Sequence, residues 1–200
     1  MLKKFSLNQV LIMLLFQSAN GQIKTYEDSI IAYEQIYIDT HEVVGENDRK
    51  YIHFYEVDKR YRALASFKKI TDKKGFDMNT SSGMKKHYFI YGLLTFTIND
   101  SLLHLYIYQS ADLMRQEKYK DYLFVPFGDA TSGFESYGGG RYIEFYISDI
   151  KNGHVIIDFN KAYNPYCAYT TGYNCPIPPK ENLLPVSISS GEKNFGKPFH

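Results

Sequence analysis

The segment that most constrains the fold is residues 92–108, GLLTFTINDSLLHLYIY, in which apolar and polar residues alternate on both sides of Asn99 and Asp100. Alternation with a period of two is typical of a strand with one buried face, and a tight turn between two such runs closes an antiparallel hairpin. A turn at Asn99 and Asp100 sets Phe96 opposite Leu103 on the apolar face. The chain is therefore predicted to contain an antiparallel sheet that covers a core on one side.

An amphipathic helix is predicted for residues 26–44. Thr25, followed three residues later by Asp28, matches a capping box, and aromatic and apolar residues then recur at helical spacing. Most other segments show strand or loop patterns. They are a hairpin over 51–70 that turns near Asp58 and Lys59, a polar loop over 71–87, a short helix within 110–122, and a strand over 123–127 placed near a sheet edge because Pro126 cannot donate to a ladder.

Residues 141–160, RYIEFYISDIKNGHVIIDFN, predict a second hairpin. A turn of two residues would bury the Asp158 carboxylate among apolar groups, which is costly. A turn of three residues at 151–153 avoids this and sets Phe145 opposite Phe159 on the core face. The opposite face then carries Glu144, Tyr146, Asp158 and Asn160.

Together these patterns predict a mainly β (α+β) fold. We expect an antiparallel β-sandwich or partly closed barrel, with one N-terminal amphipathic helix packed on the sheet.

Residues 1–21 have the pattern of a cleaved secretory signal peptide. Lys3 and Lys4 precede the apolar run VLIMLLF, and a small-x-small cleavage pattern ends at Gly21. The apolar run is too short to span a bilayer, so no transmembrane span is expected in the mature chain. Residues 22–200 are expected to form one exported globular domain, periplasmic or secreted.

The charge balance argues against nucleic acid as a partner. The chain has 23 Lys and Arg against 22 Asp and Glu, so it lacks the basic field that binding to phosphate backbones needs. The sequence also gives no reason to expect a cofactor or a bound metal.

Cys167 and Cys175 lie in a proline-rich stretch, residues 158–185. Export favours a disulfide between them, while a metal pair or two buried free thiols are the alternatives. A stretch held in this way is predicted to be first a structural segment and second the wall of a pocket.

The sequence lacks the common catalytic signatures, such as a nucleophile elbow or a zinc-binding helix. Arg141 follows a glycine-rich loop and can clamp a carboxylate or an anionic ligand. Any catalysis is expected to rest on carboxylates as general acid and base. The candidates are Asp129, Glu135, Asp158 and Glu181.

Four motifs in order give the chain a resemblance to a known family. FVPFGDATSGFESYGGGRYIEF, VIIDFNKAYNPYCAY, NCPIPPKENLLPVSISSGEK and YGLLTFTIND together resemble the bacterial family known as domain of unknown function 1684, over about residues 50–197. The resemblance implies exported proteins and lipoproteins with no assigned activity. This chain departs from many members at Ser136 and at Leu183 and Leu184, and it lacks a lipoprotein cysteine after the apolar run.

These observations leave three hypotheses open. The first is a non-enzymatic binding or scaffold module for a small polar ligand or envelope component, with a polar pocket between residues 128–142 and 158–182. The second is a carboxylate-based hydrolase or transferase acting on a saccharide or acyl substrate. The third is a buried network of arginine and acids that only maintains the fold. The predicted binding residues are Arg141, Glu144, Tyr146, Asp158, Asn160, Asn164 and Asn182.

Overall fold

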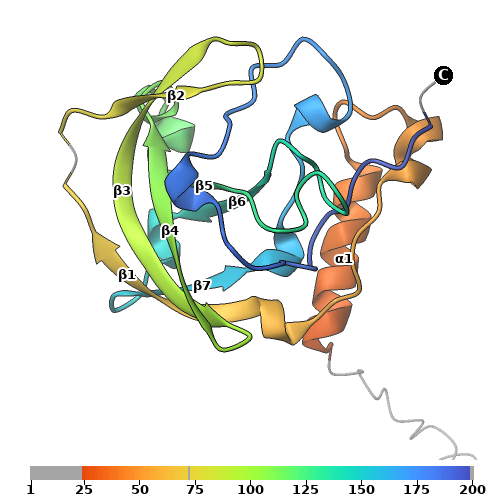
Figure 1. Ribbon diagram of the computed structural model, residues 1–200, viewed down its shortest axis with the longest axis horizontal. Coiled ribbons are helices and arrows are strands. Elements are labelled where there is room, and N and C mark those ends of the chain that lie inside the picture. The colour runs from red at the N-terminus through yellow and green to blue at the C-terminus, as the bar shows by residue number, and fades with distance from the viewer. Residues whose placement is uncertain (1–23, 72, 199–200) are drawn as a thin grey trace, which may run out of the picture.

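The protein is a curled antiparallel sheet with one N-terminal α-helix. The computed structural model describes residues 24–71 and 73–198; the predicted signal peptide lies outside them. Within these ranges the sheet has the order β6-β5-β4-β3-β1-β7, and β2 pairs with β3. Figure 1 shows the sheet as an open half-barrel, with β2 and β3 at the left of the view and α1 at the right. The elements are α1 (Tyr26–Asp39), β1 (Arg62–Lys69), β2 (Phe76–Asn79), β3 (Lys85–Ile98), β4 (Ser101–Ser110), β5 (Tyr122–Phe127), β6 (Arg141–Tyr146) and β7 (His154–Asp158).

The hairpin predicted at residues 92–108 is confirmed as the β3–β4 pair. Phe96 lies opposite Leu103, as the alternation requires. Asn99 and Asp100 have φ values of 46° and 62°, the left-handed conformation that a two-residue hairpin turn needs. This turn therefore determines the register of the two central strands.

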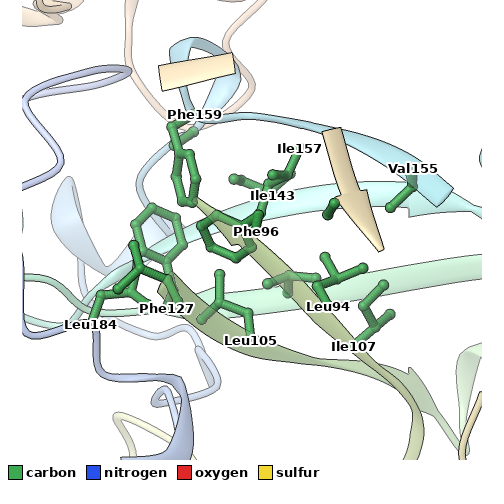
Figure 2. Close-up of a cluster of buried hydrophobic side chains, with 14 of the residues drawn as sticks. Leu94, Phe96, Leu105, Ile107, Phe127, Ile143, Val155, Ile157, Phe159 and Leu184 are labelled. Atoms are coloured by element: carbon green, nitrogen blue, oxygen red, sulfur yellow. The ribbon is translucent and has the colours of Figure 1, made fainter. Parts of the chain in front are cut away.

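The main core fills the inside of the curl. Leu94, Leu105 and Ile107 from the central hairpin meet Phe127 and Phe159 there (Figure 2). Leu184 and Ile188, from the C-terminal segment that follows the last strand, are buried in the same cluster. The predicted fold class, mainly β with an antiparallel sheet and an N-terminal helix, is confirmed.

The helix begins where the sequence predicts and ends earlier. Thr25 and Asp28 form a capping box at its start. The helix ends at Asp39 rather than at Val44 because the chain then folds back to bury His41. Its ring packs 4.5 Å from that of Tyr169, and its Nδ1 accepts the Val44 amide at 3.1 Å.

The predicted hairpin over 141–160 is wrong. Strands β6 and β7 lie at opposite ends of the main strand order, where β6 pairs with β5 and β7 pairs with β1. A 3₁₀ turn at residues 147–149, in which the Asp149 carboxylate accepts the Tyr146 amide, leads the chain away after β6. Phe145 and Phe159 are still buried in the core, as predicted, because alternation sets the buried face whichever strand is the partner.

Three local expectations also need correction. Residues 51–70 form a 3₁₀ turn and an extended stretch that leads into the single strand β1, instead of a hairpin. The polar stretch 71–87 contains β2 and the start of β3, which pair with each other and bury Met78. Strand β5, which contains Pro126, lies between β4 and β6 instead of at an edge.

An asparagine side chain allows the proline to occupy an interior strand. The Asn182 amide nitrogen donates to the carbonyl oxygens of Pro126, at 2.8 Å, and Tyr106, at 3.0 Å. Its side-chain oxygen accepts the Tyr106 amide at 2.8 Å. Asn182 thus supplies the hydrogen bonds that β4 and β5 do not exchange at this point, and it is fully buried.

We predict that Asn182→Ala destabilises the protein by about 2–4 kcal/mol, because buried backbone groups on both strands lose their partners. Urea unfolding measures the change. Glu181→Ala, at the exposed neighbouring position, is the matched control and should stay within ~0.5 kcal/mol. A similar small change for both variants would contradict the assigned role.

Candidate functional site

A cavity of about 500 Å³, here called the tyrosine cavity, lies between α1, the strands β3, β5 and β6, and residues 163–176. Tyr33 and Tyr37 reach it from α1 because a spacing of four places them on one helix face. On β5 and β6 the alternation that sends Leu123 and Phe145 into the core turns their neighbours outward. The other aromatic rings of the lining include Tyr122, Phe124, Tyr142, Tyr163 and Tyr166.

Glu144 is the acid of this cavity. The Tyr122 hydroxyl donates to its Oε1 at 2.7 Å, and the Tyr163 hydroxyl donates to the same oxygen. No described residue forms a hydrogen bond with Oε2. Burial, followed by the charge of Glu144, raises the Tyr122 pKa far above its usual value, so this phenol stays protonated as a donor.

Three further hydroxyl groups of the lining are directed to protein acceptors. Tyr142 donates to the Pro176 carbonyl oxygen at 2.6 Å, and Tyr166 to Glu42 at 2.6 Å. Tyr33 donates to the Lys161 carbonyl oxygen at 3.3 Å. The wall formed by these residues and Glu144 therefore offers a ligand mainly ring carbon and one carboxylate oxygen, while Lys86 lines the cavity from β3.

Behind the helical wall lies a second acid, Glu192, which is fully buried. Its carboxylate accepts hydrogen bonds from the Tyr169 hydroxyl at 2.5 Å, the backbone N–H of Asn164 at 2.8 Å and the Tyr37 hydroxyl at 3.2 Å. Burial raises the Glu192 pKa to about 7, and these hydrogen bonds oppose the rise. Glu192 thus joins α1 to the 163–176 wall of the cavity.

Arg141 lies away from the tyrosine cavity, in a buried ion pair. Its Nη2 is 2.8 Å from Asp129 Oδ2, and both side chains are completely buried. The guanidinium also donates to the carbonyl oxygens of Ile188, Ser190 and Glu192. This pair anchors the C-terminal segment to β6 and matches the third hypothesis, a network that maintains the fold.

Asp158 and Asn160 form another structural network. The Tyr26 hydroxyl donates to both Asp158 oxygens, at 2.9 and 3.0 Å. The Asn160 side chain contacts the Tyr26 hydroxyl and both backbone polar groups of Asp58. These contacts fasten the start of α1 and the segment before β1 to the end of β7.

The remaining predicted site residues are dispersed. Tyr146 and Asp158 line a second cavity of about 610 Å³ between β6 and β7, which shares Tyr33, Glu144 and Tyr163 with the tyrosine cavity. Asn164 lines the tyrosine cavity. The catalytic candidates do not meet: Asp129, Asp158 and Glu181 line three different cavities, and Glu135 lies on an exposed turn where it accepts from Tyr55.

The two cysteines shape the wall formed by residues 163–176. Cys167 and Cys175 lie at disulfide-bonding distance, with Cα atoms 6.3 Å apart. Cys175 and Tyr173, at the end of the loop that this pair closes, line the cavity. Across the described residues, no group of three or more His, Cys, Asp or Glu is arranged to hold a metal ion.

The chain belongs to the family described as "Protein of unknown function (DUF1684)", whose model matches residues 48–193. Among solved structures, it is similar to an uncharacterized protein of Haloarcula marismortui determined by solution NMR. The two share 28% identity and a TM-score of 0.63, over 84% of this chain and 94% of the other. Comparison with curated proteins gives no match. In the part of the chain that the structure describes, no helix is both long and apolar enough to cross a membrane.

The sequence analysis missed most of the cavity because its lining is aromatic and not charged. Of the predicted binding residues, Glu144 and Asn164 line the tyrosine cavity. A signal for the rest was present: 19 tyrosines in 200 residues is a strong bias, and several occupy the outward positions of strands. Such positions are also typical of ordinary β-structure, so the bias alone does not indicate a site.

We predict that Arg141→Met destabilises the protein by about 3–5 kcal/mol, because the buried Asp129 carboxylate loses its counter-charge. The double variant Arg141→Met/Asp129→Asn should recover part of this loss, since no unpaired charge remains. Urea unfolding of both variants tests the ion pair. A double variant no more stable than the single one would contradict it.

We also predict that stability falls as pH rises from about 4.5 to 7. A Glu carboxyl has a pKa of about 4.3 in the unfolded chain. With a pKa of about 7 in the folded protein, Glu192 keeps its proton over this range. The stabilisation that this proton provides is fully present below the unfolded pKa and disappears as the pH rises through the folded pKa. Between the two pKa values the free energy of unfolding falls by up to about 1.4 kcal/mol per pH unit. Burial raises the Glu34 pKa to about 7 as well, so both acids contribute.

Chemical denaturation at several pH values measures this slope. Glu192→Gln should reduce it, while Glu46→Gln, at an exposed position, should leave it unchanged. An unchanged slope in Glu192→Gln would show that Glu192 does not hold a proton in the folded state.

Proposed function

We propose that this protein is a non-enzymatic binding module that holds a small molecule in the tyrosine cavity. The observation that carries the proposal is a preformed cavity of about 500 Å³ in which the hydroxyl groups of Tyr33, Tyr142 and Tyr166 are already bonded within the protein. Ligand sites are typically concave, largely apolar and of about 300–1,000 Å³, with a few polar groups that orient the ligand. Here the Glu144 carboxylate is such a group.

The placement of the acids supports binding over turnover. A hydrolase of the kind considered above needs an acid and a base within reach of one substrate. Asp129 is committed to Arg141 and Asp158 to Tyr26. Glu135 and Glu181 lie elsewhere on the surface. The role in the cell envelope, as an exported protein, is part of the same proposal and rests on the signal-like pattern of residues 1–21.

A pair of neighbouring substitutions tests the cavity. Leu113 lines the tyrosine cavity, whereas Met114 faces a separate hollow beside β3. Compounds from a metabolite library that bind the protein, detected by ligand-observed NMR, should lose binding to Leu113→Trp because the larger ring occupies the cavity. They should retain it with Met114→Trp. The proposal fails if no compound binds, or if the binders are indifferent to Leu113→Trp.

A further inference from the structure

We propose that the ligand of the tyrosine cavity is an organic cation, with an ammonium group seated against Glu144. This inference rests on the proposed function and adds the chemical class of the ligand. Three observations support it: the charge of Glu144, the arrangement of the aromatic rings, and the small number of hydroxyl groups that are free to bond a ligand.

The first observation is an unpaired negative charge on Glu144, an exposed side chain that lines both the tyrosine cavity and the second cavity. Among the described residues, no lysine, arginine or histidine forms an ion pair with Glu144. Both of its phenol donors bind Oε1, so Oε2 is left for a ligand. A carboxylate held in a fixed position by two neutral donors is suited to receive a cation.

The second observation is the geometry of the rings. Tyr142 crosses Tyr163 at 90° with centroids 5.9 Å apart, and it crosses Phe124 at 72° and 4.7 Å. The lining therefore has walls in several planes and does not form one flat platform. Ammonium groups bind over ring faces, within about 6 Å of a ring centroid, and rings in several planes offer such faces in more than one direction.

The protein itself places an ammonium group against one of these rings. Lys161, which lines the second cavity, has its Nζ 5.5 Å from the ring centroid of Tyr33, a residue that both cavities share. Tyr33 is thus already used for a cation–π contact from the side of the second cavity.

The third observation argues against a neutral, hydroxyl-rich ligand such as a saccharide. Such ligands are bound through many hydrogen bonds, and Tyr33, Tyr142 and Tyr166 direct their hydroxyls to protein acceptors instead. Breaking these bonds would leave the protein acceptors without partners. A cation needs the ring faces and the carboxylate only.

Lys86 is the opposing charge in the lining, and it comes from β3, at the other side of the cavity from β6. Three strand spacings of about 4.8 Å separate β3 from β6 along the sheet. An ammonium group held at Glu144 therefore lies at the end of the cavity away from Lys86.

Two probes of nearly equal shape test the proposal: choline and its neutral isostere 3,3-dimethylbutan-1-ol. Isothermal titration calorimetry should show choline binding at least about tenfold more tightly, because only choline gains the cation–π and carboxylate terms. Glu144→Gln should remove this preference. Lys86→Met should tighten choline binding, because it removes the positive charge from the lining. Thermal unfolding confirms that each variant is folded, and the comparison of probes on the unaltered protein stands without the variants.

The outcomes separate the two proposals. Equal binding of both probes, or binding of N-acetylglucosamine with no binding of choline, would overturn the cationic ligand and leave the binding function intact. Choline binding that is insensitive to Glu144→Gln would likewise overturn it. No binding of these probes, together with no compound from the metabolite library, would overturn both.

Discussion

The buried Arg141–Asp129 ion pair is the interaction on which the rest of the structure depends. Its guanidinium holds carbonyl oxygens of residues 188–192, a stretch with no ladder of its own. The end of this stretch passes so close to Phe159 that a Cβ at Gly191 would stand 2.5 Å from its carbonyl oxygen, and Gly191 has a φ of 76°. Glycine is needed there for both reasons. The pair therefore fixes the position of Glu192, which in turn ties Tyr37 and Asn164 together.

A buried ion pair is a weak source of net stability, since desolvation offsets most of the attraction between the charges. Its role here is to hold segments of the backbone in position. Beyond β7 the chain forms 3₁₀ turns and extended segments, which meet the rest of the chain at isolated bridges. Buried side chains bond backbone groups that no ladder satisfies. Arg141 does so for residues 188–192. Asn182 and Asn160, which both follow β7, do so for the gap at Pro126 and for the segment at Asp58. Buried polar residues therefore help to hold the irregular segments against the sheet.

The difference between regular strands and irregular segments explains what could be predicted from the sequence. The β3–β4 hairpin was predictable because its strands are neighbours and its turn determines the register. The partners of β6 and β7 were not, since alternation fixes the buried face of a strand but leaves its partner open. Strand β6 pairs with β5, the strand before it, and β7 pairs with the distant β1. Arg141 and Asp129 suggested chemistry by residue type, yet only burial shows that they neutralise each other. Glu144 was identified as a site residue, but its phenol partners come from β5 and from beyond β7.

The tyrosine cavity is consequently a product of long-range assembly. One wall is the helix at the start of the chain, one is the outward face of the sheet, and one is the loop closed by Cys167 and Cys175. Tyr37 belongs to the lining and also donates to the buried Glu192, so the position of the wall and the anchor of the C-terminal segment are linked through one side chain. A ligand that binds only the assembled cavity stabilises the folded state by mass action. That stabilisation acts on the contacts of α1 and of residues 163–176, two segments that lie outside the strands of the sheet and are joined to each other by Glu192.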